Sequence, residues 1–445
     1  MNIDQHWKRY EPSSANPWTL AKAGHLLRRT GFGPTTSELQ QALNDGPQPT
    51  LDRLFSEAKH STDAAQASEY AARERSLPRD AGGTQLAAWW LHRILNGSKP
   101  LHEKICLFWH DHFATSIVKV QQARFMLGHY RLLSELALGD FRKLVNGMSF
   151  DPAMMIWLDT VESRKGKPNE NYARELMELF TLGIGNYTEA DIREAARAFT
   201  GYELLNNRIV FSPRKHDDGD KSVFGSTGNW NGDDIVRLCL AKPACAEFIV
   251  RKLYRFFFSD LAAPTDDRVR TAAALYREAN YDATTLLQAM LRSEHFFSPT
   301  VYRRKVKSPV EFAVGIVRGL EGNIGALPLA QRLENLGQQL FAPPSVKGWD
   351  GGRSWLNAQT LLLRGNLASA LTSTRDSAFT DRCDPVKFLK GDVNPVDSLT
   401  KLFLQDDLPE SAKDKLAAYA DAHPKGDGIR SLTHLICSLP EFQLA

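Results

Sequence analysis

The sequence predicts a mostly α-helical, multi-helical globular protein with one small β-hairpin. Three observations predict this fold class. Apolar residues recur at helical spacing through most of the 445 residues, and Gly or Pro separates successive periodic stretches. Strand-like residues are confined to 202–230, and hydrophobic residues make up 42% of the chain, which is enough for a sizeable core.

Start and stop signals place the elements in order. Thr35 and Glu38 form a capping box after a Gly/Pro break, Pro100 suits a first helical turn, and Gly183 ends a well-marked helix. The alternating run YELLNNRIVFSP predicts a hairpin near 202–212 that turns at two asparagines. Helices are predicted at 17–29, 83–97, 119–137, 140–148, 168–184 and 188–201, and again from 233 to about 295.

Length and loop content suggest how the chain is divided. Residues 1–375 are expected to form a main helical domain that contains every polar motif described below. A loop-rich stretch at 375–397 leads into a helical C-terminal tail, residues 376–445, which we expect to pack on the main domain.

Charge and cysteine content exclude several classes. The net charge is only +3, the isoelectric point is about 8.5, and basic and acidic residues are interleaved, which argues against nucleic acid as the main partner. Five cysteines without a CxxC pair support neither a disulfide framework nor a zinc knuckle. GxSxG, P-loop, HExxH and kinase motifs are absent, which makes the common hydrolase and nucleotide-enzyme classes less favoured.

The N-terminal residues contain no apolar signal-peptide core, and no stretch approaches 18 apolar residues. We therefore expect no membrane span and, by default, a cytoplasmic location.

The run ICLFWHDHFATS, residues 105–116, is the most informative stretch. His110 and His112 flank Asp111 inside an apolar tract, where polar side chains are costly unless each finds a partner. Imidazoles are favoured ligands of zinc, copper and iron. On a regular helix, however, residues two apart point about 200° away from each other, so a shared metal requires the helix to unwind near His110. The alternative is a helix that buries His112 while His110 is hydrogen-bonded elsewhere.

The helix predicted at 168–184 is a second candidate. Asn171, Glu175 and Glu178 fall at i, i+4 and i+7 and would share a face that Arg174 borders. Helical bundles present pairs of glutamates to metal ions in this way. The alternative is a solvent-exposed face with ion pairs to Arg174 or Arg193.

Two loops complete the set of candidates. In RKHDDGDK, directly after the hairpin, His216 could be a ligand or a general base, with Asp217 orienting its imidazole; a surface turn is the alternative. The run GWDGGRSWLN, residues 348–357, combines two tryptophans, an arginine and three glycines. It suits either a stacking surface for sugars or planar groups, or an ordinary stiff loop.

These tracts together resemble the bacterial domain-of-unknown-function family numbered 1800. The resemblance rests on AGHLLRRTGFGPTTSEL, FWHDHFATS, PNENYARELMELFTLGIGNYTEADIREAARAFTGY, RKHDDGDK with FGSTG, and FAPPSVKGWDGGRSWLN, in this order over roughly residues 20–445. The family has no settled activity. The resemblance implies that seven residues occupy hallmark positions: His110, His112, Asn171, Arg174, Glu175, His216 and Asp217.

The resemblance also implies a partner. Members are often encoded beside a second family, numbered 1501, which resembles the alkaline-phosphatase and sulfatase superfamily and usually carries a twin-arginine export signal. Many family members appear with export signals of their own, and this sequence departs from them there. Export of a complex with the partner would place the protein in the periplasm.

The sharpest functional hypothesis is a metal-dependent enzyme of unknown substrate. A subset of His110, His112, Glu175, Glu178 and His216 would bind a divalent zinc, manganese or iron ion. Asp111 or Asp217 would fix a histidine tautomer, and Arg174 would bind an anionic substrate group. This hypothesis requires the three polar tracts to line one pocket.

The rival hypothesis is a non-enzymatic binding protein. The helix at 168–184 and the Trp-rich loop would then dock the phosphatase-like partner or a polysaccharide, and the histidines would be structural.

Overall fold

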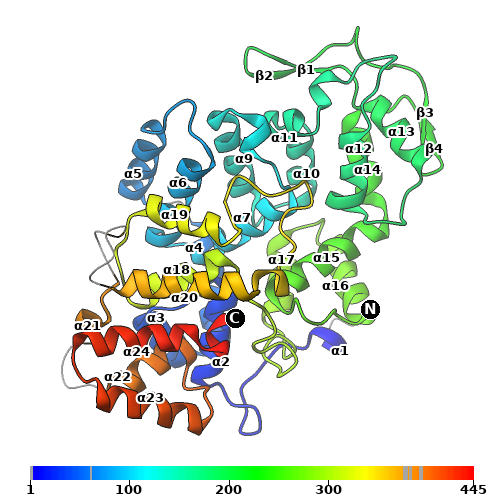
Figure 1. Cartoon of the computed structure of the whole chain (residues 1–445). Coiled ribbons are helices and arrows are strands. Elements are labelled where there is room, and N and C mark those ends of the chain that lie inside the picture. Colours follow the sequence, from blue (N-terminus) through cyan, green and yellow to red (C-terminus); the bar gives the residue numbers. More distant parts are fainter. Residues whose placement is uncertain (1–3, 61–62, 374–378, 380–382, 390–393) are drawn as a thin grey trace.

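A computed structural model describes residues 4–60, 63–373, 379, 383–389 and 394–445. The protein is mostly α-helical, and its strands form two small antiparallel pairs at one end of the molecule (Figure 1). The predicted fold class is therefore confirmed. No helix in the described part of the chain is both long enough and apolar enough to cross a membrane.

The first half of the chain is a series of helices broken by turns. They are α1 Asp4–Trp7, α2 Leu20–Thr30, α3 Thr36–Asp45, α4 Pro47–Lys59, α5 Ala64–Arg75, α6 Gly83–Asn96, α7 Pro100–His112, α8 Ile117–Val120, α9 Ala123–Leu136, α10 Phe141–Ser149, α11 Pro152–Trp157, the 3₁₀ turn Thr160–Glu162, α12 Asn171–Glu175, the π-helical segment Leu176–Thr181 and α13 Glu189–Ala198.

The strands and the remaining helices follow. They are β1 Tyr202–Leu205, β2 Arg208–Phe211, β3 Lys221–Val223, β4 Ser226–Gly228, α14 Gly232–Ala241, α15 Pro243–Phe257, α16 Asp266–Glu278, α17 Ala283–Leu291, α18 Pro309–Gly319, α19 Ala326–Asn335, the 3₁₀ turn Gly352–Trp355, α20 Ala358–Thr372, α21 Pro385–Phe388, α22 Pro395–Leu404, α23 Glu410–Ala422, α24 Gly426–Ser438 and α25 Pro440–Gln443.

The predicted hairpin forms with the expected turn. Strands β1 and β2 pair antiparallel from Tyr202–Phe211 to Leu205–Arg208. Asn206 and Asn207 both adopt positive φ, at 47° and 65°, as the tight hairpin turns that favour asparagine require. The second pair, β3–β4, lies inside the strand-like stretch 202–230 but beyond the predicted hairpin, and its two short strands give too few residues for a visible alternation.

The helix predicted at 168–184 begins later and changes its winding. It starts at Asn171, and from Leu176 the backbone widens into a π-helix in which the Leu182 N–H donates to the Met177 carbonyl. The Thr181 hydroxyl donates to the Leu176 carbonyl and thereby supports the wide turn. Such π-helical insertions are rare and are often found at functional sites.

Most buried apolar side chains of the described residues form one hydrophobic core, and Val306, Trp349 and Trp355 form a small separate cluster. The main core extends from Trp7 near the N-terminus to Phe442 near the C-terminus. The C-terminal helices take part in the main core, because α24 packs along α20 (Figure 1, lower left) and α22 contacts α18. The expected boundary at residue 375 falls outside the described residues.

Candidate functional site

Helix α7 stays regular through His112, so it does not unwind at the HDH motif. The helix begins at Pro100, and its last turn closes with the Phe113 N–H donating to the Trp109 carbonyl. His110 and His112 therefore leave the helix in different directions and contact different neighbours. The condition for a metal shared by these two histidines is not met.

His110 fastens the Trp-rich loop, residues 341–357, to α7. Its Nε2 accepts the Phe341 N–H at 3.0 Å, and its ring lies beside the rings of Trp90 and Trp349. Burial, with a contribution from His129, lowers the pKa of His110 to about 3, so the imidazole is neutral.

His112 joins α7 to the π-helical segment and to α15. Its Nε2 donates to the Phe180 carbonyl at 3.1 Å, and its Nδ1 accepts from Lys252 Nζ at 3.1 Å. These two partners fix one neutral tautomer, and burial together with the Lys252 charge holds the pKa of His112 well below its usual value. Both ring nitrogens are thus engaged within the protein.

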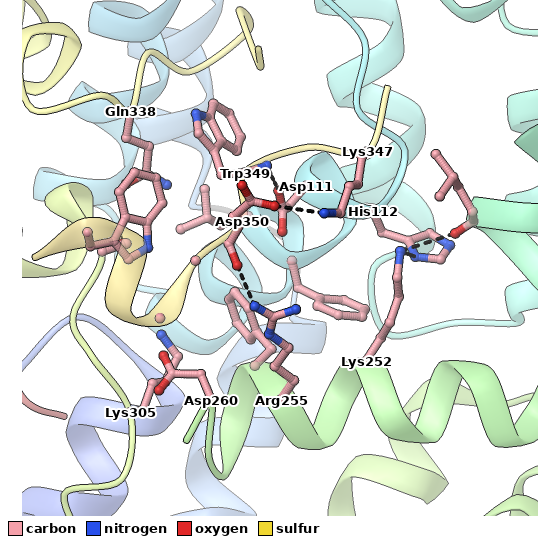
Figure 2. A pocket seen from close by; sticks show the side chains of 18 of the residues that line it. Asp111, His112, Lys252, Arg255, Asp260, Lys305, Gln338, Lys347, Trp349 and Asp350 are labelled. Carbon is pink, nitrogen blue, oxygen red and sulfur yellow. Dashed lines mark hydrogen bonds and ion pairs between the residues drawn. The ribbon is translucent and has the colours of Figure 1, made fainter. Parts of the chain in front are cut away.

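Asp111 lies between them and faces a pocket (Figure 2). One of its carboxylate oxygens accepts the Trp349 N–H at 2.8 Å. The loop approaches so closely at Gly348, where φ is +83°, that a Cβ atom would lie 2.5 Å from the Asp111 carbonyl oxygen. Only glycine combines this backbone conformation with this approach.

The pocket has a volume of about 370 Å³ and is lined by both aromatic and charged side chains, with Trp349 and Trp355 among the aromatic ones. This volume is typical of sites for small organic ligands. Its lining comes from α7, the π-helical segment and the turn after it, α15, the start of α18 and the Trp-rich loop: Leu107, Phe108, Asp111, His112, Glu178, Leu179, Gly183, Ile184, Phe248, Lys252, Arg255, Phe256, Asp260, Lys305, Ser308, Glu311, Gln338, Lys347, Trp349, Asp350, Gly351, Gly352 and Trp355.

Burial shifts the pKa values of two further pocket residues, Lys252 and Asp111, toward their neutral forms. Burial lowers the pKa of Lys252 to about 8, and its ammonium donates to two neutral acceptors, His112 Nδ1 and the Leu179 carbonyl at 3.1 Å. Burial raises the pKa of Asp111 to about 6, which the Trp349 N–H and the Lys252 charge oppose. The charge of each group thus stabilises the charge of the other.

Several other charged side chains around the pocket also have partners. At the rim, Asp350 accepts from Lys347 at 2.8 Å and, through its carbonyl, from Arg255. At the floor, the Glu311 carboxylate is shared by Lys305, at 2.8 Å, and Lys104. Burial opposes ionisation of Glu311, but the two ammoniums outweigh it and hold the pKa of this carboxyl well below its usual value.

The helix at 171–178 contributes one predicted residue to this pocket. Glu178 lines it and accepts from the Tyr187 hydroxyl at 2.7 Å. Glu175 does not line it; burial and the neighbouring Glu178 raise the pKa of Glu175. Arg174 forms ion pairs with Glu189 at 2.7 Å and Glu170 at 3.2 Å.

The post-hairpin loop lies away from the pocket. His216 donates from Nδ1 to the Thr200 carbonyl at 2.9 Å, and its ring contacts Phe211 of β2. Asp217 accepts from Arg197 through both oxygens, at 2.8 and 3.1 Å, and this pairing lowers the pKa of Asp217 to about 2. Both residues brace the hairpin end of the molecule.

The predicted site residues thus do not all meet in one pocket. Asp111, His112 and Glu178 line one pocket, while His110, Arg174, Glu175, His216 and Asp217 do not. Among the described residues, one group of three metal-ligand side chains does lie close together, with ligand atoms within 4.8 Å: His102, Glu103 and Cys106. The Glu103 carboxylate there already accepts from Trp90, Tyr130 and Arg93, which indicates a structural hydrogen-bond network.

The profile of one protein family matches almost the entire chain. This family is described as "Protein of unknown function (DUF1800)", and the match covers residues 25–444. The chain belongs to this family. The resemblance stated from the sequence is thereby confirmed, and DUF1800 membership assigns no activity. No curated protein and no solved structure matches the chain.

Sequence reasoning missed Lys252. It lies four residues after Phe248 and four before Phe256, so a single charge interrupts an apolar stripe of α15. A lysine at such a position must extend to solvent or enter a polar pocket, and this signal could have identified it. Asp260, Lys305 and Glu311 carry no comparable local signal, since their grouping depends on how α18 packs.

Proposed function

We propose that this DUF1800 protein is an enzyme that transfers protons on a small organic substrate bound in the pocket. Asp111 and Lys252 would be its acid–base pair. One observation supports this above all others: a carboxyl with a pKa of about 6 and an amine with a pKa of about 8 line the same pocket. Groups of this kind are what general acid–base catalysis near neutral pH requires.

The roles follow from the two pKa values. Between pH 6 and 8 Asp111 is ionised and serves as the base, while Lys252 is protonated and serves as the acid or stabilises a developing negative charge. The Trp349 N–H orients Asp111, and His112 with the Leu179 carbonyl orients Lys252. These contacts would preorganise both groups before the substrate enters.

The walls indicate the class of substrate. Trp349 and Trp355 line the pocket and are only 9% and 8% exposed. Together with Phe108, Phe248 and Phe256 they offer apolar faces that suit a sugar ring or a planar heterocycle. A substrate of one or two rings would fill a volume of about 370 Å³.

The predicted metal ligands fit this site poorly. His112 has no free ring nitrogen, and the Nε2 of His110 is taken by the Phe341 N–H. Of the five proposed ligands, only His112 and Glu178 reach the pocket. The proposed reaction therefore uses side chains of the protein alone, and metal dependence remains a separate prediction that elemental analysis of protein purified without chelator would test.

The first experiment measures the two pKa values. Competitive acetylation of the native protein, read out peptide by peptide by mass spectrometry, gives the titration midpoint of each lysine. We expect a midpoint near 8 for Lys252, against about 10.4 for an ordinary exposed lysine. Replacing Asp111 with Asn removes a favourable charge, so it should lower the Lys252 midpoint further. An ordinary midpoint for Lys252 would remove the basis of the proposal.

The second experiment tests catalysis. Compounds with one or two rings are screened first by thermal shift and then for turnover. Asp111→Asn and Lys252→Met should each lower kcat at least about 100-fold while the fold is retained. Lys165→Met, which changes a lysine paired with Asp218 on the surface, is the matched control. Full turnover by both pocket variants would contradict the proposed roles.

The docking hypothesis is less supported by the geometry. It relied on the tryptophans of the loop as an outer contact surface, whereas both tryptophans are largely buried. Binding to the phosphatase-like partner stays a prediction, which co-purification of the two proteins would test.

A further inference from the structure

Two cations of α15 line the large pocket, and each donates its hydrogen bonds to neutral groups. Lys252 and Arg255 are three residues apart on this helix, so their side chains leave it on the same side (Figure 2). Lys252 donates to the His112 ring and the Leu179 carbonyl. Arg255 donates to the Asp350 carbonyl. Among the described residues, neither cation forms an ion pair with a carboxylate.

Arg255 is held at the pocket although its side chain is exposed. An exposed arginine keeps much of its rotamer freedom unless a contact orders it. The bond to the Asp350 carbonyl is such a contact, and it comes from the Trp-rich loop over the pocket. The Asp350 carboxylate itself forms an ion pair with Lys347 at 2.8 Å. The guanidinium is therefore positioned by a neutral oxygen, and its other N–H donors can reach a ligand.

The charges around Asp111 are positive. Burial raises the pKa of this carboxyl, and the charges that oppose the rise are those of Lys252, Arg255 and Lys305. Lys305 already has an ion pair with Glu311 at 2.8 Å. One carboxylate thus faces two cations that have no other acidic partner.

The buried acid at the floor does not balance these cations. Burial raises the pKa of Asp260, and the charges that oppose this are those of Lys305 and Arg29. Asp260 also accepts the Val306 N–H at 3.1 Å. Its negative charge is therefore directed at the floor and not at α15.

The remaining acid of the lining, Glu178, lies outside this group. Its carboxylate accepts from the Tyr187 hydroxyl at 2.7 Å. Besides burial, the groups that shift the pKa of Lys252 are Asp111 and Arg255, and Glu178 is not among them. Two cations of α15 and one carboxylate of α7 leave one positive charge unbalanced in the pocket.

We propose that the substrate of this pocket carries a single carboxylate group, which Arg255 and Lys252 bind. This inference rests on the proposed function, because it names the class of compound on which the acid–base pair acts. A carboxylate supplies the one negative charge that is missing, and its two oxygens match the forked donors of a guanidinium. The aromatic side chains of the lining would hold the ring, so the substrate is a cyclic carboxylic acid and not a neutral sugar or an amine.

Matched probes test the charge preference. Binding of benzoate, benzamide, benzylammonium and phenyl phosphate to the full chain is measured by titration calorimetry at pH 7 and constant ionic strength. We expect benzoate to bind at least about 10-fold more tightly than benzamide, as one charge-assisted hydrogen bond provides. Equal affinities, or no binding of benzoate at about 10 mM, would overturn the proposal. Tighter binding of phenyl phosphate than of benzoate would contradict the choice of a carboxylate.

Variants assign the preference to α15. Arg255→Gln should weaken benzoate binding about 10-fold and leave benzamide binding unchanged. Arg251→Gln is the matched control, because Arg251 is on the same helix, does not line the pocket and pairs with Asp266 at 2.6 Å. Equal benzoate affinity of the two variants would refute the role of Arg255.

A crystal structure with benzoate provides a test that does not depend on either variant. The carboxylate should contact Arg255 and Lys252, and a carboxylate bound elsewhere would refute the proposal. Failure here is distinguishable from failure of the proposed function. The titration midpoint of Lys252 tests the acid–base pair without any ligand, whereas the preference for benzoate is measured without any turnover.

Discussion

Three successive side chains at the end of α7 have three separate roles. His110 and Asp111 accept backbone N–H groups of the Trp-rich loop, and His112 accepts from Lys252 while donating to the π-helical segment. Polar side chains are tolerated at these buried positions because each one bonds a buried backbone or side-chain group that would otherwise lack a hydrogen-bond partner. Of the three, only Asp111 is both partly exposed and poised to change its charge near neutral pH.

Replacing Asp111 with Asn should change how stability depends on pH. The folded pKa of about 6 exceeds the unfolded value of about 3.8, so the contribution of Asp111 is most favourable below pH 4 and is lost as the pH rises through 6. The Asn variant should therefore gain about 1–3 kcal/mol relative to the native protein between pH 4 and 6, where the lower value allows for partial exposure.

Urea unfolding at a series of pH values measures this difference. Asp217→Asn is a useful control, because Arg197 lowers the pKa of Asp217 to about 2 and the change should act in the opposite direction. A difference between the Asp111→Asn variant and the native protein that does not vary with pH would show that Asp111 titrates normally.

Among the elements, the Trp-rich loop and the π-helical segment create the pocket. The loop brings Trp349 and Trp355 over the end of α7, and the wide turn at 176–181 places Leu179 and Phe180 where their carbonyls meet Lys252 and His112. A regular α-helix would rotate Glu178 to a different position relative to Glu175, because a π-turn adds a residue to each turn. Contacts with α7 hold the Trp-rich loop in place, and contacts with α7 and α15 hold the π-helical segment, so the geometry of both depends on tertiary structure.

Gly348→Ala should displace the loop. The substitution combines the strain of a positive φ with a Cβ atom 2.5 Å from the Asp111 carbonyl oxygen. Gly166→Ala is the matched control, because φ there is +80° and no atom lies within 4 Å of the added Cβ. We expect about 1 kcal/mol of destabilisation in the control and at least about 3 kcal/mol in Gly348→Ala.

Chemical denaturation measures the stability of both variants, and tryptophan fluorescence reports the position of the loop. Equal destabilisation of the two variants would show that the loop accommodates the methyl group without moving.

The fold is organised around a main hydrophobic core in which many polar side chains are also buried. The most prominent of these is Glu311 of α18, which joins Lys104 of α7 to Lys305 and thus connects the pocket floor to the centre of the molecule. Buried ion pairs of this kind contribute little net stability when intact, but removing one partner leaves charge uncompensated.

Glu311→Gln should destabilise the protein by about 3–5 kcal/mol at neutral pH, since two buried ammoniums lose their counter-ion. The pKa of Glu311 is lowered in the folded state, so its contribution is complete above the unfolded value and declines as the pH falls below about 4. The destabilisation by Gln should accordingly shrink in acid. Unfolding free energies at pH 7 and pH 3.5 measure this change.

Glu189→Gln, which removes the exposed partner of Arg174, should have little measurable effect and serves as the control. A similarly small effect at position 311 would mean that water reaches the two lysines.

The sequence by itself determined the helical class, the approximate limits of several helices and the hairpin at 202–212, because apolar periodicity, caps and asparagine turns act locally. It also singled out the run 110–112 and Glu178 as candidates for a site. Tertiary structure alone decided that His110 faces the core, that His216 and Asp217 brace the hairpin, and that Lys252 enters the pocket. The reason is physical: a polar residue among apolar ones signals that it has a partner, but the identity of that partner depends on packing between segments far apart in the chain.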